Sequence, residues 1–248
     1  MPLVQHLLRP ALGLRRHEAP SRSWLGGDPH LAEGVAWPRG KDGSPLRFLA
    51  RLSLEEMQAA LPTPWLPAQG ALLFFHGDGG WGGSPGDRAD HAVLWVAGLE
   101  AGYLQTVTVG SGRRQRSVVS NLHPLPIQTL PPCDDPQLDP LDLDDEEGKA
   151  YIELQQVPFG DAPRHQFTGY DDPVQHSGMQ RDCEELANGR RGSDPVQAAQ
   201  RWSLLLQLDS DEELGFSWGD GGRLYFWVEP ERAARGDFSN TWRILQSH

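Results

Sequence analysis

The sequence predicts an α+β fold that is rich in β-sheet, with short helices and two related halves. Glycine and proline are abundant, at 28 and 21 of the 248 residues, so the elements must be short and the turns frequent. Runs of β-branched, aromatic and leucine residues are bounded by turn formers, which is typical of strands. Blocks of similar sequence recur in the same order in both halves of the chain. Together these observations favour a pseudo-twofold internal repeat over a helical bundle.

Residues 1–23 are expected to form an amino-terminal extension. The segment is interrupted by Pro2, His6 and Pro10, so it lacks the continuous apolar run of a signal peptide or membrane anchor. Its leucines and arginines are spaced as in a short amphipathic helix that packs on the protein's own surface: Leu7, Leu8, Leu12, Leu14, Arg9, Arg15 and Arg16.

Residues 24–132 and 149–248 are predicted to be the two halves of a single domain. The expected strands are Arg47–Leu52, Ala71–His76, His91–Val96, Gln105–Val109, Trp202–Leu208 and Arg223–Val228. A helix is predicted over Leu54–Ala60, where Ser53 and Glu56 have the spacing of a capping box. Further helices are predicted over Lys149–Gln156 and Gln175–Ala187.

Residues 133–148 are the most acidic part of the chain. Eight carboxylates, from Asp134 to Glu147, alternate with prolines there. Such a stretch has too few apolar residues to stabilise an ordered core. We therefore expect an acidic, proline-rich loop between the halves, leading into a helix whose N-terminus favours the carboxylates.

The predicted repeat consists of three blocks that occur in the same order in each half. In the first half they are 25–29, 48–56 and 70–75, and in the second half 168–173, 205–213 and 222–227. Each set reads as a glycine-proline turn, a buried strand that ends in an N-cap with acidic residues, and a second strand entered through glycine.

The second-half motifs resemble those of the bacterial YwqG-like family. They are Leu206–Asp211, then Trp218-Gly219-Asp220 with Gly222, then Leu224–Trp227. In the first half, Leu25-Gly26-Gly27 with Pro29, Trp37-Pro38 and Phe48-Leu49-Ala50 are similar to the family's amino-terminal signature. In the second half, Gly169-Tyr170 is similar to the family's middle signature. The resemblance covers roughly residues 24–246. It implies a sheet-rich α+β domain of unknown function, and it carries over no catalytic residues.

Composition bears on the class of partner. A net charge of -12 and a pI near 5.1 argue against nucleic acid, because affinity for phosphate backbones comes from Lys and Arg. The two cysteines, Cys133 and Cys183, lack the spacing of a zinc site. We expect a cytoplasmic protein that has no membrane partner and binds another protein, with a basic one favoured by complementary charge.

Acidic residues after a predicted strand suggest a metal site. Asp209, Asp211 and Glu213 occupy alternate positions, with Asp220 beyond them, and calcium prefers oxygen ligands at such spacing. The register of an EF-hand is not met, since its glycine position is Leu214. The residues are therefore candidates for a calcium site of another type, and a capped turn with solvated acids is the structural alternative.

Glycines and aromatic residues near turns are candidates for binding a ligand between the halves. They are Gly26, Gly27, Gly169, Tyr170, Trp81 and Trp218. Trp81 is expected to be exposed because glycines surround it, whereas most other tryptophans are expected to close the ends of the sheet.

The predicted function is a non-enzymatic binding module for a protein partner, with an immunity or antitoxin-like role as one form of it. Residues Gly82–Gly86 match the G-x-S-x-G pattern of hydrolases. However, Pro85 follows the serine and lacks the N–H that an oxyanion hole needs. No catalytic residue is assigned. The alternative is a receptor for a small ligand or calcium, or an enzyme, with its site between the two halves.

Overall fold

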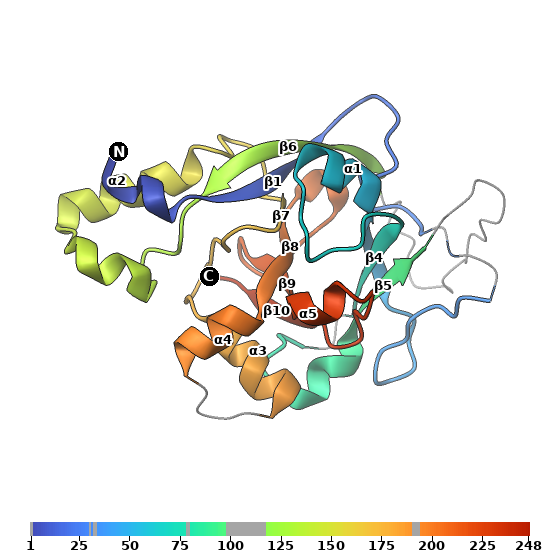
Figure 1. Cartoon of the computed structure of the whole chain (residues 1–248). Helices are drawn as coiled ribbons and strands as arrows, with labels where there is room; N and C mark the ends of the chain where they lie inside the picture. The colour runs from blue at the N-terminus through green and yellow to red at the C-terminus, as the bar shows by residue number, and fades with distance from the viewer. Residues whose placement is uncertain (1, 30, 32–33, 78–79, 98–117, 190–193) are drawn as a thin grey trace.

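A single antiparallel sheet of 10 strands curves into a nearly closed barrel (Figure 1). This computed structural model describes residues 2–29, 31, 34–77, 80–97, 118–189 and 194–248. The strand order is β10-β9-β8-β7-β1-β6-β2-β3-β4-β5. Consecutive strands therefore lie side by side at both ends of the order, while the pairing of β1 with β6 occupies the middle.

The strands are β1 (Arg9–Arg16), β2 (Trp24–Leu25), β3 (Arg47–Ser53), β4 (Ala71–His76), β5 (His91–Val96), β6 (Ser120–Thr129), β7 (Gln166–Phe167), β8 (Ser203–Asp209), β9 (Arg223–Val228) and β10 (Trp242–Gln246). The α-helices are α1 (Leu54–Ala60), α2 (Asp145–Gln156), α3 (Met179–Asn188), α4 (Pro195–Arg201) and α5 (Pro230–Ala233). Short 3-10 helices are η1 (Pro2–Leu7), η2 (Pro85–Asp90), η3 (Pro136–Leu141) and η4 (Glu212–Leu214). None of these helices is long and apolar enough to span a bilayer.

The apolar runs that predicted strands are confirmed wherever the structure describes them. β4, β5 and β9 have the expected bounds, and β3 and β8 differ from them by one residue. Helix α1 also has its expected bounds, and α3 begins four residues later than expected. The strand predicted over Gln105–Val109 lies outside the described residues.

The amphipathic helix predicted near the amino terminus is wrong, because residues 9–16 form β1. This strand pairs with β6 over its whole length, from Arg9 opposite Thr129 to Arg16 opposite Leu122. Leu12 and Leu14 are buried in the barrel, so their spacing of two reflects the period of a strand. The residues before Trp24 thus supply a central strand of the sheet.

Pro124 and Pro126 explain why β6 was not predicted, since proline cannot donate to a sheet ladder. Both are tolerated because of where their missing N–H groups would point. Leu14, opposite Pro124, donates its N–H to His165 and so away from β6. The backbone nitrogen of Pro124 therefore also points away from β1. It points toward the side where β2 pairs with β6 only at residues 120–121.

The capping box predicted at α1 is not formed. Ser53 is the N-cap residue but makes no side-chain cap hydrogen bond, and its hydroxyl donates to Glu55 at 2.9 Å instead. Glu56 accepts from the Ser23 hydroxyl at 2.5 Å and from Arg22 N at 2.9 Å. Glu56 thus anchors the segment before β2 on α1.

The main core fills the barrel with apolar side chains from the inner faces of β3, β4, β8 and β9. Leu72, Phe74, Leu206, Leu208 and Phe226 belong to it, and each is fully buried. A second apolar cluster lies on the opposite face of β8–β10, where Met179 and Cys183 of α3 pack against it. Figure 1 shows α3 and α4 beside this part of the sheet.

An acidic projection extends from the far end of the β1–β6 ladder, beside η1 (Figure 1). We call residues 133–156, which contain η3 and α2, the acidic arm. It has a small core of its own, in which Leu138 and Tyr151 pack with Leu7 and Leu130. The expected loop is therefore partly helical, and α2 begins four residues before the predicted Lys149. Asp144 starts the helix there, because its carboxylate caps α2 in a capping box with Glu147.

Candidate functional site

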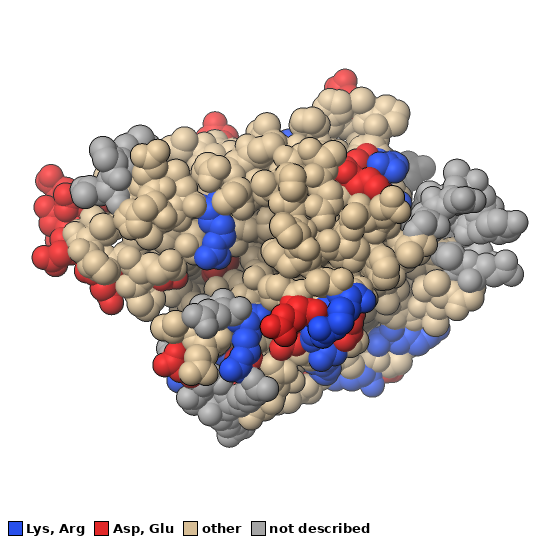
Figure 2. All heavy atoms as spheres, viewed as in Figure 1, with Lys and Arg blue, Asp and Glu red and all other residues tan. Residues whose placement is uncertain are grey.

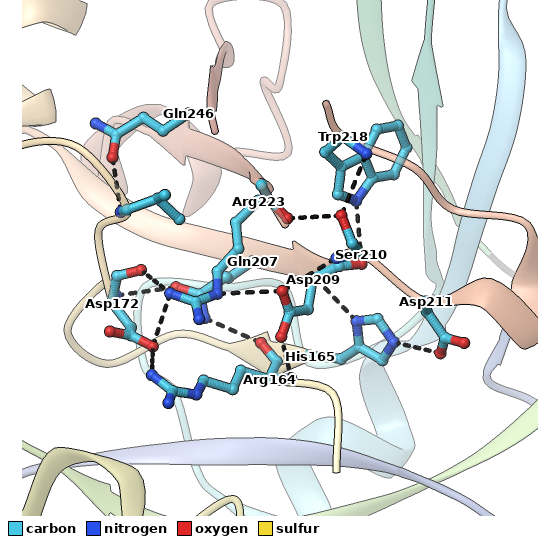
Figure 3. Close-up of polar contacts among 12 residues, drawn as sticks. Arg164, His165, Asp172, Gln207, Asp209, Ser210, Asp211, Trp218, Arg223 and Gln246 are labelled. Atoms are coloured by element: carbon cyan, nitrogen blue, oxygen red, sulfur yellow. Dashed lines mark hydrogen bonds and ion pairs between the residues drawn. The ribbon is translucent and has the colours of Figure 1, made fainter. Parts of the chain in front are cut away.

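Polar side chains converge where β8 ends, beside β7 and β9 (Figure 3). We call this group the β8 polar network, comprising Arg16, Arg164, His165, Asp172, Asp209, Asp211 and Arg223. It contains two of the three predicted metal ligands, Asp209 and Asp211. The sheet brings the members together from widely separated parts of the chain: β1, the segment around β7, the end of β8 and β9.

Asp211 and His165 form the buried part of this network, each with a side chain 2% exposed. His165 Nδ1 accepts from Asp209 N at 3.1 Å, so its other nitrogen, Nε2, carries the proton and donates to Asp211 at 3.0 Å. Asp211 also pairs with Arg16 and accepts from the N–H groups of residues 213 and 214, which caps η4. Burial raises the pKa of Asp211, but the hydrogen bonds from His165 and Arg16 outweigh it and hold this pKa well below its usual range.

Asp209 and Asp172 share Arg223. The guanidinium lies 3.2 Å from the Asp209 carboxylate and 2.9 Å from that of Asp172, which also pairs with Arg164. Burial lowers the pKa of Arg223, but the two carboxylates together raise this pKa by more than burial lowers it, so the net shift is upward. The charges thus neutralise one another inside the network.

Ser210 and Trp218 close the turn that follows β8. The Ser210 hydroxyl donates to Gly222 O at 2.9 Å and accepts from Trp218 N at 3.2 Å, while the indole of Trp218 donates to Asp209 O at 3.0 Å. Asp211 therefore caps a turn, as the structural alternative expected, but Asp209 and Asp211 are largely buried and paired with arginines instead of solvated. The network holds β8 against its neighbours.

The third predicted metal ligand, Asp220, is exposed, and its backbone carbonyl accepts from His248 N at 3.0 Å. Within the described ranges, no cluster of three or more His, Cys, Asp or Glu side chains is arranged to hold a metal. The calcium site stays a prediction.

The predicted ligand-binding glycines lie at opposite ends of β6. Gly26 and Gly27 have φ values of +71° and +69°, and a Cβ on Gly26 would be 2.2 Å from Val118 O. A Cβ on Gly169 would be 2.5 Å from Ala11 Cβ, near the other end of the ladder. Close backbone approach thus accounts for these glycines.

The predicted aromatic residues occupy different environments. Tyr170 donates to Gln137 at 3.3 Å and lies 3.8 Å beneath the Arg9 guanidinium. Trp218 is buried, and Trp81 is 56% exposed, as expected. The Trp81 ring lies near Gly219, the residue that follows Trp218 in the sequence.

A second polar cluster, absent from the sequence analysis, lies where the two outermost strands of the barrel approach each other. We call it the edge seam: His76 on β4, His91 on β5, Arg243 on β10 and the segment 80–82. Leu72, Phe74 and Val93 belong to the main core, so the alternation of side chains along β4 and β5 directs His76 and His91 inward too. Arg243 is opposite the core residue Phe226.

Hydrogen bonds join the two edges across this seam. His91 Nε2 donates to Thr241 O at 2.7 Å. Along the outer edge of β10, Trp81 O accepts from Leu245 N at 2.8 Å, and Gly82 O accepts from the Trp242 indole at 3.0 Å. The glycine-rich segment between β4 and β5 therefore covers an otherwise unpaired strand edge. In η2, Ser84 serves as the N-cap residue.

The seam combines neutral imidazoles with a charged guanidinium. Burial, together with the nearby Arg243 charge, lowers the pKa of His76 to about 3 and that of His91 to about 4. Burial also lowers the pKa of Arg243, to about 10. At neutral pH Arg243 is therefore the charged member of this trio.

Comparison with known proteins supports a family but no activity. The family model described as Domain of unknown function (DUF1963) matches residues 23–247. No curated protein matches the chain. Since the family model spans almost the whole sequence, the chain belongs to the DUF1963 family.

Proposed function

We propose that this chain is a non-enzymatic binding module that recognises a basic protein through the acidic arm. The observation that carries the proposal is the dense, exposed carboxylate charge of η3 and α2. The exposed acids of the arm are Asp134, Asp139, Asp142, Asp144, Asp145, Glu146, Glu147 and Glu153. Figure 2 shows acidic atoms gathered at the end of the molecule where Figure 1 draws this projection.

The arm's charge is not neutralised within the described part of the chain, where no ion pair joins an arm carboxylate to a basic side chain. Lys149 is the single basic residue between 133 and 156. The hydrogen bonds that Asp134, Asp135 and Asp144 accept come from backbone or amide N–H groups. The negative electrostatic potential of these carboxylates attracts and orients a basic partner.

Apolar side chains on the same projection offer contact area beside the charge. Ile152 on α2 is 42% exposed, and Val157, immediately after the helix, is 72% exposed. Apolar residues within a charged rim are typical of protein interfaces. A basic toxin masked in the cytoplasm is one partner of this kind, which would make the protein an immunity or antitoxin-like factor.

The contrast with the β8 polar network favours binding by the arm over catalysis near Asp209. Catalytic groups need free lone pairs or protons directed at a substrate. In the network, Asp209, Asp211 and His165 are instead bonded to Arg223, Arg16 and one another.

A capture experiment with matched variants tests the proposal. The arm variant carries Asp145→Asn, Glu146→Gln and Glu153→Gln, which spares the capping residues Asp144 and Glu147. The control variant carries Glu212→Gln, Asp220→Asn and Glu231→Gln, which removes the same charge from exposed sites outside the arm. Tagged proteins are used to capture partners from the native lysate, with identification by mass spectrometry.

We expect a basic protein to be captured by the wild type and the control but lost with the arm variant and at high salt. Equal capture by the two variants would overturn the proposal. If nothing is captured but calcium raises the Tm, the alternative of a calcium receptor gains support.

We also infer that β2–β5 and β7–β10 are copies of one unit, in line with the YwqG-like resemblance. Equivalent irregularities support this repeat. β3 and β8 each carry a β-bulge, at Leu49 and Leu205. Each bulge residue accepts a backbone N–H at the end of the preceding short strand, from Gly26 at 2.8 Å and Thr168 at 3.4 Å.

A further inference from the structure

Arg243 is a buried cation with one side of its guanidinium lacking a hydrogen-bond partner among the described residues. The residue is 0% exposed, and its Nη1 donates to Gly80 O at 2.6 Å. Its Nε and Nη2 atoms are shielded from solvent and have no hydrogen-bond partner in the described structure. Leaving a buried charge partly unbonded is costly, so this side of the guanidinium requires an acceptor.

Among the described residues, the two carboxylates that act on the Arg243 charge, those of Asp87 and Asp90, both lie near Lys41. Asp90 lies 3.0 Å from Lys41 Nζ, and Asp87 lies 3.6 Å from the same atom and accepts from Ser84 N at 3.2 Å. Both act on the Arg243 charge through space, but neither is hydrogen-bonded to it.

We propose that the edge seam binds a small carboxylate, held by Nε and Nη2 of Arg243. These two nitrogens carry the parallel N–H groups on one side of a guanidinium, and the two oxygens of a carboxylate match that spacing. Nη1, which is bonded to Gly80 O, holds the guanidinium in place.

The charge of the site selects a monoanion. His76 and His91 are neutral at pH 7, so Arg243 supplies one positive charge. Because Asp87 and Asp90 also act on this charge, a monocarboxylate adds less negative charge to this buried place than a dianionic phosphate would.

The two histidines of the edge seam pack against aromatic rings. The His91 ring lies 6.4 Å from that of Phe226, and the His76 ring lies 5.3 Å from that of Trp218. Exclusion of water by these rings strengthens the hydrogen bonds to the bound anion. This site is separate from the acidic arm and does not depend on the function proposed for it.

The direct test is NMR of the full chain labelled with ¹⁵N, observing the Nε–Hε resonance of Arg243, which is assigned by its loss in Arg243→Lys. The probes are sodium formate, the smallest carboxylate, sodium phosphate, and sodium chloride at matched ionic strength. We expect a saturable shift of this resonance with formate and none with chloride. A resonance that ignores formate, or that responds equally to chloride or more strongly to phosphate, would overturn the assignment.

Thermal unfolding provides a second, independent readout. Formate should raise the Tm of the wild type with the logarithm of its concentration. Arg243→Met should abolish this rise, while Arg88→Met, which removes a nearby exposed guanidinium, should keep it. A formate response that survives in Arg243→Met would contradict the proposal. If that variant fails to fold, the wild-type NMR titration decides the question alone.

Discussion

His165 donates a hydrogen bond from Nε2 to the carboxylate of Asp211 at 3.0 Å, with both side chains 2% exposed. Through this bond and the pairing of Asp211 with Arg16, the segment before β7 and the end of β1 are both fastened to the turn after β8. Two acidic residues that resemble the start of a calcium loop thus act as structural anchors.

Removing the Asp211 anchor should destabilise the fold. Asp211→Ala leaves His165 and Arg16 without their acceptor and removes the η4 cap, so we expect a loss of about 3 kcal/mol or more in the free energy of unfolding. Urea denaturation measures it. The exposed Asp220→Ala is the control, with an expected change within about 0.5 kcal/mol. Equal midpoints for the two variants would show that the network contributes little.

The buried histidines of the edge seam should make stability fall as the pH is lowered. Their pKa values are about 3 for His76 and about 4 for His91 in the folded chain, against 6.5 in the unfolded chain. Between pH 6.5 and those values the unfolded state binds more protons, so the contribution is full above pH 6.5 and declines toward pH 4. Each pKa unit corresponds to about 1.4 kcal/mol.

Substituting both histidines tests the sign. The combined variant His76→Gln and His91→Gln should show a much shallower loss of stability between pH 7 and 4 than the wild type, measured by urea midpoints. A wild-type slope retained in this variant would assign the acid sensitivity to other groups.

Asp171 should have the opposite effect on stability. It is 3% exposed, its Oδ2 lacks a partner among the described residues, and burial raises its pKa to about 7. The folded state therefore retains a proton between pH 3.8 and 7, and this contribution is full below pH 3.8 and lost as the pH rises to 7. Asp171→Asn should be more stable than the wild type at pH 8 and similar to it at pH 4. Thermal unfolding at both pH values checks this, and a variant that is weaker at pH 8 would refute it.

Gly82 and Gly83 lie in the glycine-rich segment that covers β10. Substituting Gly82 tests whether its close packing on β10 stabilises the fold, and Gly83 is the matched control. A Cβ on Gly82, where φ is +83°, would lie 1.9 Å from Arg243 O, whereas one on Gly83 would meet nothing within 4 Å. Gly82→Ala should cost about 2 kcal/mol or more, and Gly83→Ala should be nearly neutral. If both variants unfold at the same denaturant concentration, the packing of this segment on β10 is not needed for stability.

The sequence predicted elements whose signal is local and failed where the partner is distant. β4 and β9 are continuous apolar runs, whereas β6 contains prolines and β7 has two residues, so only sheet pairing identifies them. The acids after β8 were found by their spacing, but their partner Arg16 lies 195 residues from Asp211. Arg243 was missed because β10 was not predicted as a strand, and a charged residue there would have been expected to face solvent.

Binding through the acidic arm is tested most directly by the salt dependence of affinity for the captured basic partner. The dissociation constant is measured for the wild type and for the arm variant (Asp145→Asn, Glu146→Gln, Glu153→Gln) over a range of sodium chloride concentrations. We predict that the wild type binds more tightly at low salt and that the difference shrinks as salt screens the carboxylates. Equal affinity and equal salt dependence for the two proteins would contradict recognition through the arm.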